Sequence, residues 1–264
     1  MNCVAAFASF WRRSLDAGGA AVGAVLGTAI FVAAGPFLWL LMAAFVLSSS
    51  AFTRFRSSQK EWLASIQEKS GRRDAVQVMA NGGIGLAMAL LLRVTRDPAF
   101  AVAFAASFAS ATADTWASEI GVLSRRPPRS PITLRHVPRG VSGGVTLLGL
   151  GASVLGAVFI GLLFALENVR AAGNPESFAP FLLVTAGSGL LGSLFDSILG
   201  STLQAQYVTG APGANGRRTE HRTSHGVLNA LVQGVAFVTN DVVNLLSTAL
   251  AAACGALLAL IIPL

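Results

Sequence analysis

Residues 112–144 have the sequence TADTWASEIGVLSRRPPRSPITLRHVPRGVSGG, in which an apolar run ends at two acids and is followed by an arginine-rich loop. The acids are Asp114 and Glu119, and the loop closes with Arg139-Gly140 and Ser142-Gly143-Gly144. An acid at the end of a lipid-buried helix is costly unless a cation meets it. Glycines at a helix start leave backbone N–H groups open to an anion. The stretch predicts a membrane helix ending at a surface site for a metal-bound phosphate compound.

The composition of the whole chain is that of an integral membrane protein. Of its 264 residues, 53% are hydrophobic and 12% are charged, and the mean hydropathy is +0.65. Long apolar runs favour α-helices, because transmembrane β-strands are alternating segments of about ten residues. We therefore expect an all-α, polytopic transmembrane helical bundle that forms a single integral-membrane domain over residues 1–264.

About seven apolar segments are predicted to cross the membrane, with a range of six to eight. A Gly35-Pro36 turn separates the first two segments, and the last is long enough to be broken in two. The segments cover residues 17–34, 36–50, 77–92, 98–113, 141–166, 179–208 and 226–260.

Basic residues are concentrated on one side of this predicted bundle. Sixteen of the nineteen lysines and arginines lie before the first segment or in the connections 51–76, 121–140 and 209–225. The positive-inside rule therefore places the N-terminus, these loops and the predicted site on the cytoplasmic side, in a bacterial-type cytoplasmic membrane. Topology explains the net charge of +7 without a nucleic-acid partner. Anionic membrane lipids and phosphate compounds are the expected partners.

Four acids lie within or at the ends of the apolar segments, and those segments contain no lysine or arginine to pair with them. The acids are Asp114, Glu119, Asp196 and Asp241. Three states stay open: protonated carboxyl groups, ligands of a divalent metal, or partners of arginines that reach in from the loops. Because Asp196 lies in a stripe of small and polar residues that ends at Gln204, this face is either a helix-packing surface or a cavity wall.

Two further groups of residues are candidates for binding. Asn240 and Asn244 share a helix face beside Asp241, midway along an otherwise apolar segment, which indicates a functional cluster. Arg139 differs from the other loop arginines because it directly precedes Gly140 and a predicted helix start, where a guanidinium and backbone N–H groups can hold one phosphate. The chain has no P-loop, protein-kinase signature or zinc-protease motif.

Several of these motifs occur together in an order that resembles a known polytopic family. They are ADTWASEIG at 113–121, RG at 139–140 with SGG at 142–144, GSLFDSILG at 192–200 and NDVVN at 240–244. Two flanking stretches, SSS at 48–50 with TRF at 53–55, and RDAVQVMANGG at 73–83, are also similar. The family (domain of unknown function 92) includes plant and cyanobacterial phytyl-phosphate kinases and the animal transmembrane protein 19.

The resemblance implies transfer of a phosphoryl group from a nucleoside triphosphate, CTP or ATP, to an isoprenyl monophosphate such as phytyl phosphate. It implies that Asp114 and Asp196 hold Mg²⁺, with Glu119 or Asp241 as further candidate ligands. Arg139, as the fourth catalytic candidate, contacts phosphate together with the Gly143 and Gly144 amides. Further candidate substrate-binding or phosphate-binding residues are Arg54, Lys60, Asn81, Gly140, Ser142, Ser197, Gln204, His225, Asn240, Asp241 and Asn244.

Two other classes of function stay open. A transporter or flippase is the main alternative, and it requires acids spread through the depth of the membrane to form a proton or cation path. A lipid-binding membrane protein without catalytic activity is the third possibility. A CDP-alcohol transferase is disfavoured because its paired aspartate motifs are missing.

Overall fold

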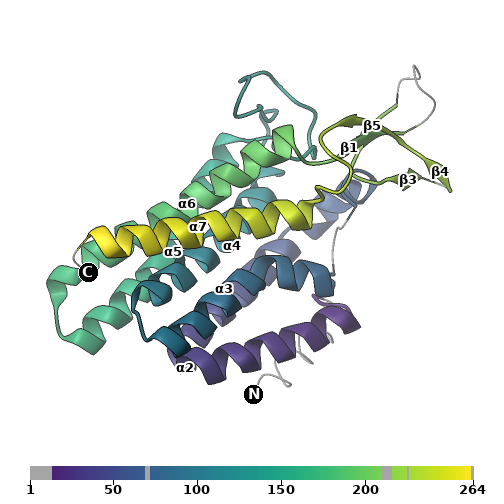
Figure 1. Ribbon diagram of the computed structural model, residues 1–264. Helices are drawn as coiled ribbons and strands as arrows, with labels where there is room; N and C mark the ends of the chain where they lie inside the picture. Colours follow the sequence, from purple (N-terminus) through teal and green to yellow (C-terminus); the bar gives the residue numbers. More distant parts are fainter. Residues whose placement is uncertain (1–13, 69–71, 210–215, 225, 263–264) are drawn as a thin grey trace.

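The computed structural model describes residues 14–68, 72–209, 216–224 and 226–262. Six long helical elements run roughly alongside one another, and short strands gather beyond one end of them (Figure 1). The helical elements are α2 (Ala17–Arg54), α3 (Ala75–Thr95), α4 (Ala99–Gly121), α5 (Leu147–Ala172), α6 (Phe178–Thr202) and α7 (Asn240–Ile261). Two 3-10 helices, η1 (Ser57–Ser65) and η2 (Pro175–Ser177), lie in connections.

The α2 element is a helical hairpin rather than one straight rod. Its break lies at Gly35, whose φ of 81° and ψ of 179° no helix contains, directly before Pro36. The side chain of Arg54 donates a hydrogen bond to Ser14 Oγ, so the two ends of α2 lie side by side. The Gly35-Pro36 turn predicted from the sequence is therefore confirmed, because glycine tolerates this φ and proline cannot continue the preceding helix.

The α4 helix lies at the centre of the bundle and contacts α2, α3, α5, α6 and α7. Small residues allow its neighbours to approach closely: a Cβ added at Gly189 of α6 would lie 2.5 Å from Ala109 Cβ. At Gly192 the added atom would lie 2.3 Å from Ser110 Oγ. These glycines of the α6 stripe therefore serve helix packing, which was one of the two interpretations of that stripe.

The hydrophobic character of the helices agrees with a membrane location. Within the described residues, five helical segments are long and apolar enough to cross a membrane. These are Ala17–Arg54, Ala75–Thr95, Leu147–Ala172, Pro175–Thr202 and Asn240–Ile261. Their outer faces carry many exposed leucines, valines and isoleucines, as lipid-facing surfaces do.

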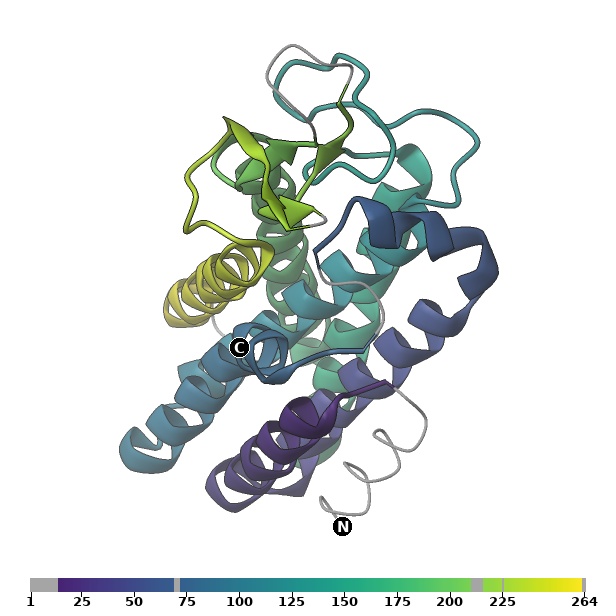
Figure 2. The same cartoon turned by 90° about the vertical axis from the view of Figure 1, so that its right-hand side faces the viewer.

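The all-α prediction needs correction at one end of the molecule, where the chain is mostly helical but not entirely so. A three-stranded antiparallel sheet has the order β2-β1-β5, and a separate pair is formed by β3 and β4. The strands are β1 (Gln206–Val208), β2 (Arg218–Thr219), β3 (Thr223–Ser224), β4 (Val227–Leu228) and β5 (Ala230–Gln233). Figure 2 shows these strands above the ends of the helices.

Three predicted segment boundaries are wrong, and glycines with positive φ explain the two that are helix starts. Segment 179–208 continues past the end of α6 into β1, and segment 226–260 begins with strands, so that α7 starts only at Asn240. The helix predicted from residue 141 begins at Leu147, after a Thr146 N-cap. Gly143, Gly226 and Gly234 have φ values of 78°, 78° and 76°, which a right-handed helix cannot include.

Candidate functional site

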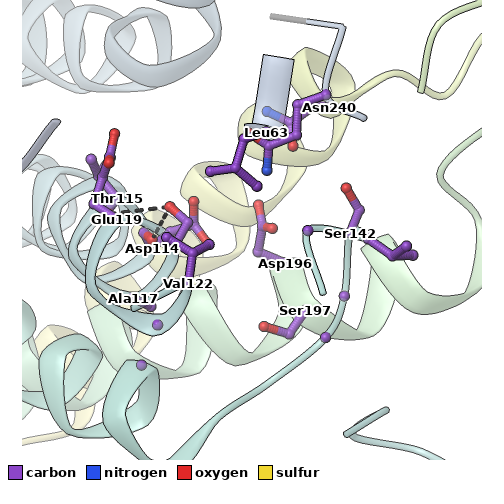
Figure 3. Close-up of a pocket in the computed structure, with 18 of the residues that line it drawn as sticks. Leu63, Asp114, Thr115, Ala117, Glu119, Val122, Ser142, Asp196, Ser197 and Asn240 are labelled. Carbon is purple, nitrogen blue, oxygen red and sulfur yellow. Dashed lines mark hydrogen bonds between the residues drawn. The ribbon is translucent and has the colours of Figure 1, made fainter. Parts of the chain in front are cut away.

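A polar cavity of about 540 Å³ opens at the strand end of the bundle. Its wall is built by α2 to α7, η1 and the loop between α4 and α5 (Figure 3). Fifteen of the residues predicted from the sequence line it: Lys60, Asn81, Asp114, Glu119, Arg139, Gly140, Ser142, Gly143, Gly144, Asp196, Ser197, Gln204, Asn240, Asp241 and Asn244. Segments far apart in the sequence therefore meet in one hollow.

Two predicted site residues are not part of this wall. Arg54 is exposed at the end of α2 and donates its hydrogen bond to Ser14 Oγ. His225 lies outside the described residues.

Asp114 and Asp196 form the central pair of the cavity. Their carboxyl groups, carried by α4 and α6, line the same cavity and lie close enough to influence each other electrostatically. Ser247 on α7 donates a hydrogen bond of 3.2 Å to Asp196 Oδ2. Since Gly192 brings α6 close to α4 and α7, three helices together position the pair. Figure 3 shows both aspartates beside the same hollow.

Glu119 is neutralised by a lysine from the loop side of the cavity. Lys60 Nζ lies 2.7 Å from Glu119 Oε2, and the two side chains are 7% and 21% exposed. Thr53 Oγ1 donates a further hydrogen bond of 2.7 Å to Glu119 Oε1. Of the three states left open for the acids, pairing with a loop cation therefore applies to Glu119. The cation is a lysine of η1 rather than an arginine.

The sequence pattern predicted that Asp241 lies midway along a membrane span, and this prediction is wrong. It is the second residue of α7, and both Asp241 and Asn244 are buried at the cavity end of that helix. Asn240, the first residue of α7, also lines the cavity. Because Asp114, Glu119 and Asp196 line the same hollow, all four acids gather at one end of the bundle.

Residues 139–144 form a loop and not the start of a helix. A Cβ at Gly143 would lie 2.2 Å from Ser201 N, so this loop packs directly on the end of α6. Gly144 N donates to Val141 O at 3.3 Å, and Arg139 Nη2 donates to Arg125 O at 2.6 Å. The prediction that these amides stand open at a helix N-terminus is therefore wrong for Gly144. Arg139 is exposed at the mouth of the cavity.

Glu220 is a cavity residue that the sequence analysis missed. It accepts hydrogen bonds from Ser142 Oγ and, at 3.0 Å, from Gln204 Nε2. Burial raises the pKa of Glu220 above its ordinary value, and the hydrogen bond from Ser142 opposes this shift. The signal available in the sequence was a single acid in a loop whose other charged residues, Arg217, Arg218 and Arg222, are basic.

Arg73 and Gln77 are two further cavity residues without a predicted role. Both lie at the start of α3, where Asp74 and Gln77 form a capping box. The RDAVQ stretch was recognised only as part of the family resemblance. The capping box explains Asp74 and Gln77 locally, but it does not explain why an arginine lines the cavity beside them.

The cavity suits a metal site with fewer protein ligands than the four acids predicted from the sequence. Within the described ranges, no group of three or more histidines, cysteines, aspartates and glutamates is placed to hold a metal ion. The Asp114 and Asp196 pair still fits Mg²⁺, because Mg²⁺ is usually bound by one or two carboxylates together with waters and substrate phosphates. Glu119, engaged with Lys60, is a weaker candidate.

Long apolar helices around a carboxylate-lined cavity at one end define a polytopic integral membrane protein with a buried polar site. Comparison with known families agrees with this conclusion. The family model described as "Integral membrane protein DUF92" matches residues 1–252. The chain belongs to this family, and the resemblance seen in its motifs is thereby confirmed.

The curated relatives include proteins of a plant, an archaeon and a cyanobacterium. The chain is 31% identical to Protein PGR of Arabidopsis thaliana, over 94% of this chain and 90% of that protein. It is 31% identical to Protein VTE6, chloroplastic, of the same plant, over 55% of this chain and 45% of that protein. An uncharacterized membrane protein of Methanocaldococcus jannaschii is 30% identical over 76% of this chain and 80% of that protein. No solved structure matches the chain.

Proposed function

We propose that the protein is a membrane-embedded prenyl-phosphate kinase, which transfers a phosphoryl group from ATP or CTP to an isoprenyl monophosphate such as phytyl phosphate. The observation that carries this proposal is the convergence of Asp114 and Asp196, from two helices, on one cavity lined by polar residues. Membership of a family that includes phytyl-phosphate kinases supports it.

The chemistry needs positioning and charge more than it needs a base. An oxygen of the prenyl monophosphate attacks the terminal phosphorus of the nucleotide, and the bond to the nucleoside diphosphate oxygen breaks. The monoester is largely a dianion at neutral pH and is already a nucleophile. Asp114 and Asp196 would hold Mg²⁺, which supplies positive charge to the phosphates. Arg139 at the mouth would contact the donor nucleotide.

The membrane arrangement follows from the same proposal. Counting both arms of α2, seven segments cross the membrane, with the N-terminus and the cavity on the cytoplasmic side. Soluble nucleotide then enters from the strand end, while the prenyl tail stays in the apolar part of the bundle. This arrangement explains why a kinase for such a substrate is built into the membrane.

Transport is the alternative that the geometry disfavours. A proton or cation path needs polar groups along the full depth of the membrane. The four acids of the apolar segments instead share the strand end, because Asp241 lies at the start of α7.

The test uses the purified full chain in nanodiscs with Mg²⁺, labelled ATP or CTP, and phytyl, geranylgeranyl or farnesyl monophosphate. We expect label in a prenyl diphosphate with the wild type and its loss with Asp114→Asn and Asp196→Asn. Glu176→Gln is the matched control, because Glu176 is exposed in η2 at the opposite end of the bundle. Absence of any diphosphate, together with nucleotide-independent uptake into proteoliposomes, would refute the kinase and support a transporter.

A further inference from the structure

Arg73 lies two residues before α3, and its backbone is hydrogen-bonded to the segment that leads into α2. Its N–H donates to Ser14 O at 3.0 Å, and its carbonyl accepts from Asp16 N at 3.1 Å. A Cβ added at Gly19 of α2 would lie only 2.4 Å from Arg73 O, so these two segments of the backbone are in close contact. The position of Arg73 is therefore set by both α2 and α3.

The guanidinium of Arg73 lies at the boundary between the polar cavity and the aromatic core. It stands over the ring of Phe45 at 5.7 Å. Phe45 packs on Phe108 with ring centroids 5.7 Å apart, and both rings are buried. On the polar side, Arg73 lines the same cavity as Asp114 and Asp196.

Within the described residues, no carboxylate forms an ion pair with Arg73. The acid whose charge acts on the guanidinium is Glu119, which already forms an ion pair with Lys60. Burial lowers the pKa of Arg73, and the charge of Glu119 opposes this shift. Arginine nevertheless remains charged in proteins. Across the described ranges of the chain, no acceptor takes a hydrogen bond from its guanidinium.

A half-buried cation with unused donors at this boundary matches an amphipathic anion. In a lipid monophosphate, the phosphate is the point at which the polar head joins the apolar tail. A guanidinium binds phosphate through paired hydrogen bonds, and the interaction is strong where water is excluded. Arg139 differs in both respects, since it is exposed at the mouth and donates to Arg125 O.

We propose that Arg73 binds the phosphate of the lipid substrate, so that the prenyl monophosphate sits with its head between Arg73 and the aspartate pair. The inference rests on the proposed function for the identity of the lipid, but it concerns binding and not phosphoryl transfer. The competing role is structural, with the guanidinium serving only to cover Phe45. The two roles differ in whether the phosphate group of the ligand matters.

The first experiment measures binding of labelled farnesyl monophosphate and of farnesol to the full chain in nanodiscs, without nucleotide. We expect Arg73→Gln to weaken farnesyl monophosphate binding roughly 10- to 100-fold, Arg73→Lys to weaken it less, and farnesol binding to change little. Arg93→Gln is the control variant, with lipid binding close to that of the wild type, because Arg93 is exposed in the last turn of α3 and does not line the cavity. Equal losses for the two ligands, or unchanged binding in Arg73→Gln, would overturn the proposal.

A second measurement needs no variant. Phenylglyoxal modifies accessible arginines, and mass spectrometry locates the label. We expect farnesyl monophosphate to protect Arg73 and farnesol not to protect it; equal labelling of Arg73 with and without farnesyl monophosphate would overturn the proposal.

Failure of the kinase and failure of the Arg73 role have different signatures. If farnesyl monophosphate binds through Arg73 but no diphosphate forms with either nucleotide, the kinase fails and the binding site stands. If diphosphate forms and Arg73→Gln has an unchanged KM for the lipid, the kinase stands and the Arg73 role fails.

Discussion

Asp114 on α4 and Asp196 on α6 line one cavity with their carboxyl groups close together, and Ser247 on α7 donates a hydrogen bond to Asp196. Two adjacent carboxylates cannot both be ionised unless a cation lies close to them. In the proposed reaction, a metal ion held by the two carboxylates would supply that cation. This relationship makes the two residues a single functional unit.

The first prediction concerns that unit. Asp114→Asn and Asp196→Asn are each expected to lower kcat/KM by about 100-fold or more, because either change removes one carboxylate of the pair. The double variant is expected to lose little more than either single variant, since residues that act together are not additive. Initial rates at several Mg²⁺ concentrations measure this. Independent, multiplying losses would contradict a shared site.

The second prediction concerns the ion pair of Lys60 and Glu119. Lys60→Met leaves a largely buried carboxylate without its partner, which we expect to cost roughly 3 kcal/mol of folding free energy. Lys60→Met combined with Glu119→Gln is expected to recover part of the loss. Thermal unfolding in detergent measures both. Glu167→Gln, which breaks the pair with the exposed Arg170, serves as the control and is expected to change little.

The sequence predicted the parts of this molecule that depend on local chemistry. The turn at Gly35-Pro36 is a property of those two residues. Asp114 and Asp196 could be identified because a carboxylate in an apolar helix is costly and usually has a function. The partner of Glu119 could not be predicted, because Lys60 lies 59 positions away in a polar loop. Arg73 and Glu220 were missed for the same reason: charged residues in loops are usually solvated, and only the fold shows which of them line a cavity.

The boundaries of α6 and α7 show a second limit. Residues 226–238 are apolar enough to extend a membrane helix, and hydropathy alone does not separate a short apolar strand from a helical turn. The conformation of this segment is decided by its tertiary contacts. A Cβ at Gly234 would lie 2.2 Å from Gln204 O, so this segment passes directly over the end of α6 in a conformation with positive φ.

The third prediction concerns Glu220 and pH. Its pKa is raised in the folded protein, so the folded state binds the proton more tightly than the unfolded state. This contribution to stability is present below the unfolded-state pKa and is lost as the pH rises through the folded-state pKa. Glu220→Gln keeps an acceptor for Ser142 and removes the titration. We expect the Tm of the variant to rise relative to the wild type as the pH increases, whereas parallel Tm profiles would contradict the assignment.

The fourth prediction concerns the loop that carries Ser142. Gly143→Ala places a Cβ 2.2 Å from Ser201 N at a residue with φ of 78°. We expect a loss of more than about 2 kcal/mol and a displaced loop, with lower kinase activity. Gly187→Ala is the matched control, because Gly187 is helical in α6 and an added Cβ meets nothing within 4 Å. The control is expected to be neutral or up to about 1 kcal/mol more stable. Equal Tm values for both variants would contradict the packing of the loop on α6.

The last prediction concerns the side of the membrane on which the cavity opens. The basic connections lie at the strand end, whereas η2 lies at the opposite end between α5 and α6. Ser58 in η1 and Glu176 in η2 are both exposed, so Ser58→Cys and Glu176→Cys report on the two ends. In a background without Cys3 and Cys254, we expect a membrane-impermeant maleimide to label Glu176→Cys on intact cells. Ser58→Cys should react only after permeabilisation, because a nucleotide-dependent site must face the cytoplasm. Labelling of Ser58→Cys on intact cells would place the cavity outside, away from nucleotide, and would remove the physical basis of the kinase.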